Sequence, residues 1–431
     1  MSGCLALEST AMDAMELRRK RLHSLVDLAR ASKGWSKAQL ARALDRDPTK
    51  IYPDSGNPKA DFLMKLAEVL EWPVGDVMEI VWGAGSDAEK NEDPSLSFED
   101  LFNKSRAAHH RGDARQTVAL AKSMYQAAKN EDHKCVACSV EASGWDMLGR
   151  YTQEVDACRR GLMHSPTNPL RRQQLRAVLA NAWYALWDLT PALGTAELLV
   201  QWFDNNPPLN DVDKKRPAYV RYVRGNTHRR LAMIEPEMRE QHLRSAREDL
   251  AAAAGQHEEL AGKLDTPSLG GIANTCRGGL IEIAVESGLE DASDAVGEIV
   301  GSLKKIDPAD AQLTGDWLES WGWWCTIGSD LALRHLKGRD LQEAVTFLNS
   351  RALTIAERSD NWALRERVFT LQYGLHRTIT DSTGLDIDFK LDEENRSLVT
   401  ATMGRFPSFR TVGWQILATA KLVDANGEVG S

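Results

Sequence analysis

The sequence predicts an all-α protein, in which a small basic helical domain precedes a long array of helix pairs. Apolar residues recur at helical spacing along nearly the whole chain, and Ala, Leu, Arg and Glu dominate from residue 96 to about residue 423. No run of alternating β-branched residues is long enough for a sheet. Because the chain has 431 residues, two or more domains are expected.

Charge is distributed unevenly between these two parts. The chain as a whole carries a net charge of −9, yet residues 15–65 hold twelve Lys or Arg and only six Asp or Glu. A basic module on an acidic protein is the electrostatic layout expected for local contact with phosphates. Six cysteines without framework spacing suit a reducing cytoplasm, and neither a signal peptide nor a membrane-spanning run is evident, so a cytoplasmic protein without membrane contact is expected.

Residues 34–44 predict the first helix of a helix-turn-helix. Ser36 can cap this helix by accepting a hydrogen bond from a free backbone N–H. Leu40 and Leu44 make an apolar face, and Ala41 is small enough for two helices to cross closely. This helix is therefore expected to support a second one.

The second helix is expected over residues 48–52, after a turn at 45–47. Asp47 can cap it, Pro48 suits its first position, and Ile51 points back at the first helix. A helix, a short turn and a second helix form the geometry that lets the second helix enter a DNA major groove.

Further helices are expected over residues 15–31, 59–71 and 74–82. Residues from 83 onward are polar and rich in Gly, Ser and acids, which is typical of a linker. The expected division is a disordered N-terminus (1–14), a helix-turn-helix domain (15–82), a linker (83–97) and a helical-repeat domain (98–425).

Residues 15–82 resemble the lambda-repressor-like, Xre/Cro-type helix-turn-helix family. The resemblance is carried by residues 34–44 (GWSKAQLARAL), 57–58 (NP), 62–70 (FLMKLAEVL) and 72–77 (WPVGDV). It implies double-stranded DNA as a partner, with base contacts from the second helix and phosphate contacts around it. The implied DNA-binding residues are Ser36, Lys37, Gln39, Asp47, Thr49, Lys50, Tyr52 and Lys59.

The sequence departs from that family at the turn and in the second helix. Asp45 and Arg46 stand where the family usually has Gly and a hydrophobic residue. Pro53 follows Tyr52, and proline disfavours helical geometry in the preceding residue. The recognition helix is therefore expected to be little more than one turn, and a domain kept for dimerisation or protein contact is the alternative interpretation.

Five tetrads of small and aromatic residues recur at intervals of 38 to 48 residues in the second part of the chain. Each precedes a turn and a second amphipathic helix, such as the one predicted over Tyr151–Met163 or Leu341–Glu357. Such loose self-similarity favours an α-solenoid, whose helix pairs bury apolar faces against their neighbours. The tetrads are residues 142–145 (ASGW), 180–183 (ANAW), 225–228 (GNTH), 273–276 (ANTC) and 320–323 (SWGW).

This part of the chain resembles tetratricopeptide repeats, with residues 149–155 as the most typical inter-helix turn. The whole arrangement is similar to that of peptide-sensing RRNPP-type regulators and other Xre–tetratricopeptide transcription factors. The resemblance implies a solenoid that binds a small peptide or protein, and a homodimer that docks on two DNA half-sites.

Polar residues at and near the tetrads are candidates for a peptide or partner site. Amides can hydrogen-bond the backbone of an extended peptide, and arginines with a histidine can bind acidic groups. Helix packing and solvated charge are the alternative interpretation of the same residues. The candidates are Asn181, Asn226 and Asn274, with Arg221, Arg224, His228 and Arg229.

Two further groups have competing interpretations. Trp317, Trp321, Trp323 and Trp324 favour a core stripe over an aromatic binding wall. The thiols at residues 135 and 138 have metal-like spacing but lack further ligands, so buried thiols are expected and no metal or cofactor is predicted.

The sequence thus predicts a DNA-binding transcriptional regulator that senses a peptide or protein, with a non-DNA-reading interaction scaffold as the alternative. It shows no phosphate-binding loop, nucleophile elbow or paired-histidine zinc helix, and no cluster of titratable groups, so an enzyme is not expected.

Overall fold

The computed structural model describes residues 15–16, 18–27, 29–30, 33, 35–70, 74–82, 96–310, 312–384 and 388–422. The chain divides into two compact units, Met1–Pro94 and Ser95–Ser431. The expected disordered N-terminus and most of the expected linker lie outside the described residues. Gly34 and the 72–73 pair of the family motif also lie outside them.

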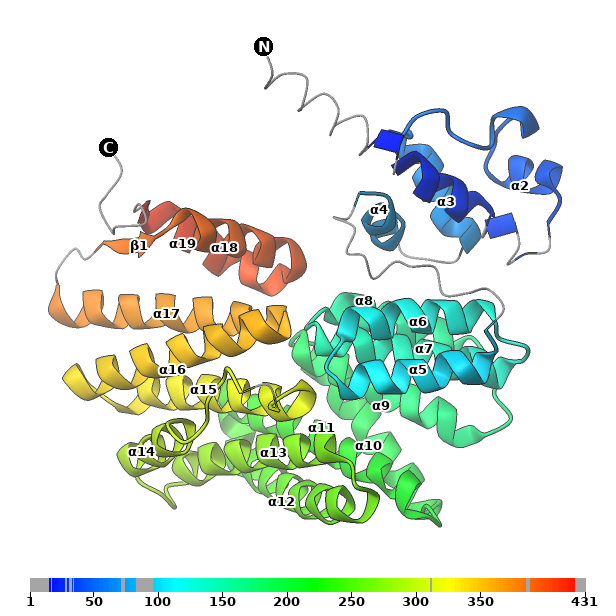
Figure 1. Cartoon of the computed structure of the whole chain (residues 1–431). Helices are drawn as coiled ribbons and strands as arrows, with labels where there is room; N and C mark the ends of the chain where they lie inside the picture. The colour runs from blue at the N-terminus through cyan, green and yellow to red at the C-terminus, as the bar shows by residue number, and fades with distance from the viewer. Residues whose placement is uncertain are drawn as a thin grey trace. The chain divides into compact units, whose positions relative to one another are not determined.

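The first unit is a small helical domain (Figure 1). Its described residues between 15 and 33 are helical. Leu22, Leu40, Ile51, Phe62 and Leu66 are fully buried together, so the apolar face expected from the sequence forms the core. The elements that follow are α2 (Lys37–Ala43), the 3-10 helix η1 (Pro48–Lys50), α3 (Ala60–Leu70) and α4 (Val74–Trp82).

The second unit is a helical array, which confirms the predicted all-α fold class. Successive helices from α5 to α13 pack on one another, and the series continues through α15, α16 and α17 (Figure 1). Its helices are α5 (Phe98–His110), α6 (Ala114–Gln126), α7 (Glu131–Met147), α8 (Tyr151–Leu162), α9 (Pro169–Ala185), α10 (Leu189–Asn205), α11 (Asp211–Ile234), η2 (Pro236–Met238), α12 (Arg239–Leu264), α13 (Pro267–Glu286), α14 (Ala292–Leu303), α15 (Gly315–His335), α16 (Gly338–Ser359), α17 (Trp362–Thr383), α18 (Glu393–Arg405), η3 (Pro407–Phe409) and α19 (Arg410–Thr419).

A short strand pair corrects the expectation that the chain has no sheet. β1 (Phe389–Leu391) and β2 (Ala420–Leu422) pair in parallel, with Phe389 opposite Ala420. Three residues a strand are too few to give a periodic sequence signal, which explains why the pattern did not reveal them. None of the helices in the described ranges is long and apolar enough to cross a membrane.

The small residues of the tetrads lie where helices approach one another most closely. A Cβ atom added to Gly144 would lie 2.6 Å from Val118 of α6, and one added to Gly225 would lie 2.9 Å from Leu250 of α12. At Gly322 the same atom would lie 2.6 Å from Leu364 of α17. The tetrads therefore mark close helix crossings, as their small residues predict.

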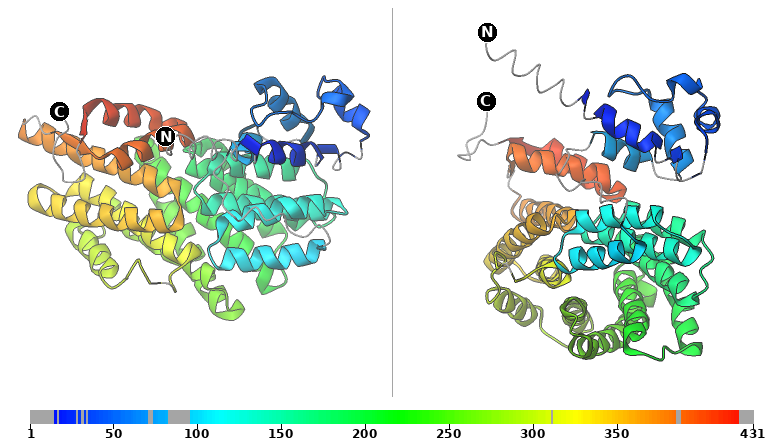
Figure 2. Two further views of the ribbon diagram at one scale, coloured as in Figure 1. Left: turned by 45° about the horizontal axis from the view of Figure 1, so that its top comes forward. Right: turned by 45° about the vertical axis from the view of Figure 1, so that its right-hand side comes forward.

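The array of the second unit curves until its last helices touch its first ones (Figure 2). The backbone N–H of Trp362 donates to the carbonyl of Leu148 at 3.3 Å, and Arg115 pairs with Asp360 at 2.6 Å. We call this region, where residues 112–150 meet residues 314–363, the seam. It closes the solenoid into a ring.

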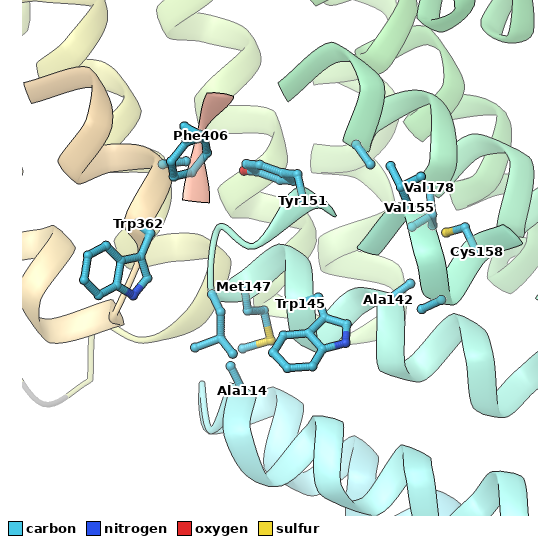
Figure 3. Close-up of a cluster of buried hydrophobic side chains, with 14 of the residues drawn as sticks. Ala114, Ala142, Trp145, Met147, Tyr151, Val155, Cys158, Val178, Trp362 and Phe406 are labelled. Atoms are coloured by element: carbon cyan, nitrogen blue, oxygen red, sulfur yellow. The ribbon is translucent and has the colours of Figure 1, made fainter. Parts of the chain in front are cut away.

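Gly149 permits this closure. It has a φ of +60°, and an added Cβ would lie 2.6 Å from Asn361 Oδ1, an atom that caps α17 by accepting from the N–H groups of Ala363 and Leu364. Apolar side chains from both sides of the seam share one buried cluster, in which Trp145 and Met147 lie on one side and Trp362 and Phe406 on the other (Figure 3).

A pair of glycine substitutions tests the close contact at the start of α15. In Gly271→Ala the new Cβ would lie 2.5 Å from the carbonyl of Asp316, so we expect a loss of stability of about 1–3 kcal/mol. Gly255 is an exposed α12 residue with open space around it, so Gly255→Ala should instead add about 0.5–1 kcal/mol. Thermal unfolding of both variants measures these changes in stability. Equal changes in the two variants would contradict the close contact of Gly271 with Asp316.

Candidate DNA-binding face and ligand cavity

The first helix of the helix-turn-helix begins with a capping box. The Ser36 hydroxyl accepts from the N–H of Gln39 at 3.3 Å, and the Gln39 side chain accepts from the N–H of Ser36 at 2.8 Å. This confirms Ser36 as the predicted cap. It also shows that Gln39 satisfies a backbone donor of its own helix.

The turn explains both departures from the family pattern. Asp45 has a φ of +52°, the left-handed conformation for which glycine is the usual residue and which Asp tolerates better than most. Arg46 takes the place of a hydrophobic residue by laying its guanidinium 4.3 Å from the centre of the Phe62 ring. The turn therefore keeps its geometry with polar residues.

The second helix is a single 3-10 turn, Pro48–Lys50, which bears out the expectation that it is little more than one turn. Asp47 caps it by accepting from the N–H of Thr49 at 2.8 Å and from its hydroxyl at 2.6 Å. Tyr52 is half-buried, and its hydroxyl donates to Asp27 at 2.5 Å, so its polar end faces the domain's first helical segment.

Most of the predicted DNA-binding side chains are exposed. Their exposure leaves open the DNA role that the resemblance implies. The exposed ones are Ser36, Lys37, Gln39, Asp47, Thr49, Lys50 and Lys59.

The second unit contains a partly open cavity of about 290 Å³ inside the ring. Side chains of α5, α7, α8, α9, α11, α12, α13, α15 and α17 line it, so both sides of the seam contribute to one wall. A volume of this size lies at the lower end of the range for small-molecule sites.

Two of the three predicted asparagines line this cavity. Asn181 donates to Asp146 at 3.2 Å, and Asn226 accepts from Arg229 at 3.2 Å while donating to a carbonyl of its own helix. Asn274 instead lies in the buried contact between α13 and α15, where it donates to Ser320 at 2.9 Å.

Of the other candidates, Arg229 lines the cavity, whereas Arg221, Arg224 and His228 lie outside its lining and have partners within the protein. Arg224 makes two hydrogen bonds to Asp249, at 2.6 and 2.8 Å, and Arg221 lies 3.6 Å from the same carboxylate. His228 lies 2.9 Å from His242, nitrogen to nitrogen. These residues join α11 to α12.

Three carboxyl groups line the cavity where it meets the seam. Asp146 comes from the last turn of α7, and Asp316 and Glu319 come from the first turns of α15. Burial and the Asp316 carboxylate raise the pKa of Asp146 to about 7, and the hydrogen bond from Asn181 acts in the opposite direction. Burial also raises the pKa of Asp316.

Glu319 and Glu154 extend this acidic cluster. Burial, with the charges of Asp146 and Asp316, raises the pKa of Glu319 well above its ordinary value, although Trp323 donates to it at 2.9 Å. Glu154 has no exposed surface, and its pKa is raised by burial and by Asp146 and Glu319. The expectation that the helical array holds no cluster of titratable groups is therefore wrong.

The sequence alone hides this cluster because its two halves, Asp146 with Glu154 and Asp316 with Glu319, are more than 160 residues apart. Asp146 directly follows the first tetrad, and Asp316 and Glu319 directly precede the last one. These positions predict an acidic cluster only if the first and last tetrads are already known to meet across the ring.

Aromatic rings line the same part of the cavity. Tyr219 and Tyr222 stack with ring centres 5.7 Å apart, and both lie in electrostatic range of Asp146, as does Tyr151. Trp323 lines the cavity.

The tryptophan cluster thus divides between its two interpretations. Trp321 and Trp324 are buried in the core, whereas Trp323 faces the cavity and Trp317 is partly buried.

A second region of the cavity is basic, and two of its arginines have partners within the protein. Arg229 pairs with Glu282, and Arg230 lies between the rings of Tyr184 and Trp187, 3.9 and 4.3 Å from their centres. Arg230 also donates to the carbonyl of Tyr184 at 2.7 Å. These two arginines are therefore held by protein groups.

The cysteine pair is buried in α7. Cys135 donates to the carbonyl of Gly161 at 3.4 Å, and burial raises the pKa of Cys138 to about 12. His133 stacks on Phe98 with ring centres 3.9 Å apart. These contacts suit packing side chains, as expected.

Comparisons with known proteins give a remote likeness only. No family model matches the chain, and a search of curated proteins finds no match. Among solved structures, the chain is similar to a Rap protein complexed with competence and sporulation factor, at 12% identity and a TM-score of 0.43, over 93% of this chain and 98% of that one.

The raised pKa of Asp146 predicts a specific pH dependence of stability. Because the folded state holds this proton more tightly than the unfolded state, the free energy of unfolding falls as pH rises from about 4 to about 7. Asp146→Asn removes the ionisation, so its stability relative to the wild type should grow over that range, by on the order of 2 kcal/mol. Denaturant unfolding of the wild type and Asp146→Asn at pH 5, 6, 7 and 8 measures the difference in their free energies of unfolding. A difference that does not change with pH would contradict the burial of an uncompensated carboxyl group at residue 146.

Proposed function

We propose that this chain is a DNA-binding transcriptional regulator whose helical ring binds a small ligand. The observation that carries the proposal is the exposed helix-turn-helix surface. Lys37, Thr49 and Lys50 stand on a domain whose core buries the residues that the resemblance places inside. A capped first helix and a buried Ile51 support the proposal, because they hold the second element against the first helix, as a helix-turn-helix needs.

The cavity supports the part of the proposal in which the helical ring binds a small ligand. It offers two asparagine amides and charged groups to a ligand, as a site for a short peptide or another small polar molecule would. A homodimer, which would present two helix-turn-helix domains to half-sites about one helical turn apart, remains part of the proposal.

An interaction scaffold is the second candidate, and one observation favours it. The second helix has only three residues, and the hydroxyl of Tyr52 is taken by Asp27 rather than presented outward. A domain of this kind could retain its fold while contacting a protein instead of base edges.

Selection of bound fragments from genomic DNA decides between the two candidates. The full chain is compared with a Lys37→Ala/Lys50→Ala variant, since both lysines are exposed and outside the core. An enriched motif that disappears with the variant would support a sequence-specific regulator. No enrichment with either protein at low salt would overturn the DNA-binding proposal and leave the scaffold.

Salt dependence gives a quantitative prediction for one residue. If Lys50 neutralises a phosphate, Lys50→Ala should weaken DNA binding at every salt concentration and reduce the slope of log K against log[salt] by about 1. Lys263→Ala is the matched control, because Lys263 is an exposed lysine of α12 paired with Glu259. Fluorescence anisotropy between 50 and 200 mM salt measures both; equal slopes for Lys50→Ala and the wild type would exclude this contact.

A further inference from the structure

The carboxyl groups at the seam lack counter-charges. Among the residues that the structure describes, none of Asp146, Glu154, Asp316 and Glu319 forms an ion pair with a lysine, arginine or histidine, whereas Asp249 and Glu282 nearby each pair with arginines. Removing carboxylates from water without pairing them is costly. The seam therefore gathers negative charge that the described protein groups leave uncompensated.

Glu154 gives a second, independent sign that a donor is missing. Its side chain is fully buried, yet neither carboxylate oxygen has a hydrogen-bond partner. Buried polar atoms in proteins are nearly always satisfied, so an orphan pair of this kind needs an explanation. The charges of Asp146 and Glu319 both act on Glu154, so Glu154 belongs to the same acidic group as the carboxyl groups that line the cavity.

The surroundings of the acidic wall suit an organic cation. Tyr151, Tyr219, Tyr222 and Trp323 line the same region, and a cation is attracted to the faces of aromatic rings as well as to carboxylates. In the described part of the chain, the hydroxyl groups of the three tyrosines have no protein partner and can accept from an N–H donor.

The size and geometry of the site narrow the ligand class. A cavity of about 290 Å³ holds a small molecule or a few residues of a peptide and not a protein domain. No group of three or more metal-ligating side chains within the described ranges is arranged to hold a metal ion. The charge that fits is therefore a nitrogen cation on an organic molecule.

We propose that the cavity binds a ligand through a primary ammonium or guanidinium group, held by Asp146, Asp316 and Glu319. These carboxyl groups come from opposite sides of the seam, so the bound cation joins the first and last parts of the ring. The inference rests on the part of the proposed function that makes the cavity a ligand site, and does not depend on DNA binding.

Direct binding to the full chain tests the inference without DNA. The probes are spermidine, 1,5-diaminopentane, L-arginine and a pool of tripeptides containing lysine or arginine, each compared with its N-acetylated or citrulline-containing neutral counterpart. We expect saturable binding of at least one cationic probe by isothermal titration calorimetry, and no binding of its neutral counterpart. Free amines and peptides are thereby distinguished as the source of the cation.

Two isosteric variants locate the binding group. Asp146→Asn and Glu319→Gln remove charge while keeping the oxygen atoms that accept from Asn181 and Trp323. Each should weaken binding of the cationic probe at least tenfold. Glu366→Gln is the matched control, because Glu366 lines the same cavity, is not one of the three carboxyl groups and accepts from the Thr370 hydroxyl; the affinity of this variant should stay within twofold of the wild type.

The pH dependence of binding gives a further readout. Since burial disfavours the charged form of these carboxyl groups, a bound cation must displace protons, so affinity should rise between pH 6 and pH 8. His109 and His110 face Asp316 and lower its pKa, and Lys215 and Arg216 are further basic groups of the cavity lining. Binding that is unchanged in both variants, or equal for neutral probes, or absent for all four cationic probes overturns the inference. None of these binding results decides the outcome of the DNA selection, so the two proposals are tested separately.

Discussion

Ring closure at the seam is the constraint on which the second unit depends. A solenoid buries each helix pair only against its neighbours, so its two ends need not meet. Here Gly149 allows the α7–α8 turn to approach the start of α17 within contact distance, and Leu148 accepts a hydrogen bond from the Trp362 N–H. The shared apolar cluster then makes the first and last helices parts of one core.

Closure has an electrostatic consequence that an open solenoid would avoid. It brings Asp146 toward Asp316 and Glu319, and each raises the pKa of another by charge repulsion. Those carboxyl groups would face water in an open array. The repulsion among these carboxyl groups opposes closure of the ring. The ion pair of Arg115 with Asp360 and the apolar packing around Trp362 favour it.

The sequence predicted what depends on neighbours along the chain. Ser36 and Asp47 act as caps because capping needs only residues two or three positions away, and Gly144 and Gly225 mark crossings of consecutive helices. The acidic wall depended on contacts across the ring, which no local pattern encodes. Arg224 and His228 have their partners on α12, the next helix along the chain.

The cavity and the seam share residues, and this limits how a ligand could act. A ligand shifts a conformational equilibrium only by the difference in its affinity for the two states. Because Asp146 stands on one side of the seam and Asp316 and Glu319 on the other, a ligand touching all three binds the closed ring better than any open form. Asn181 and Asn226 lie on helices that stay adjacent whether or not the ring closes, so contacts to them alone would give little difference. A ligand of the kind proposed above would therefore favour the closed ring through the carboxyl groups of the seam.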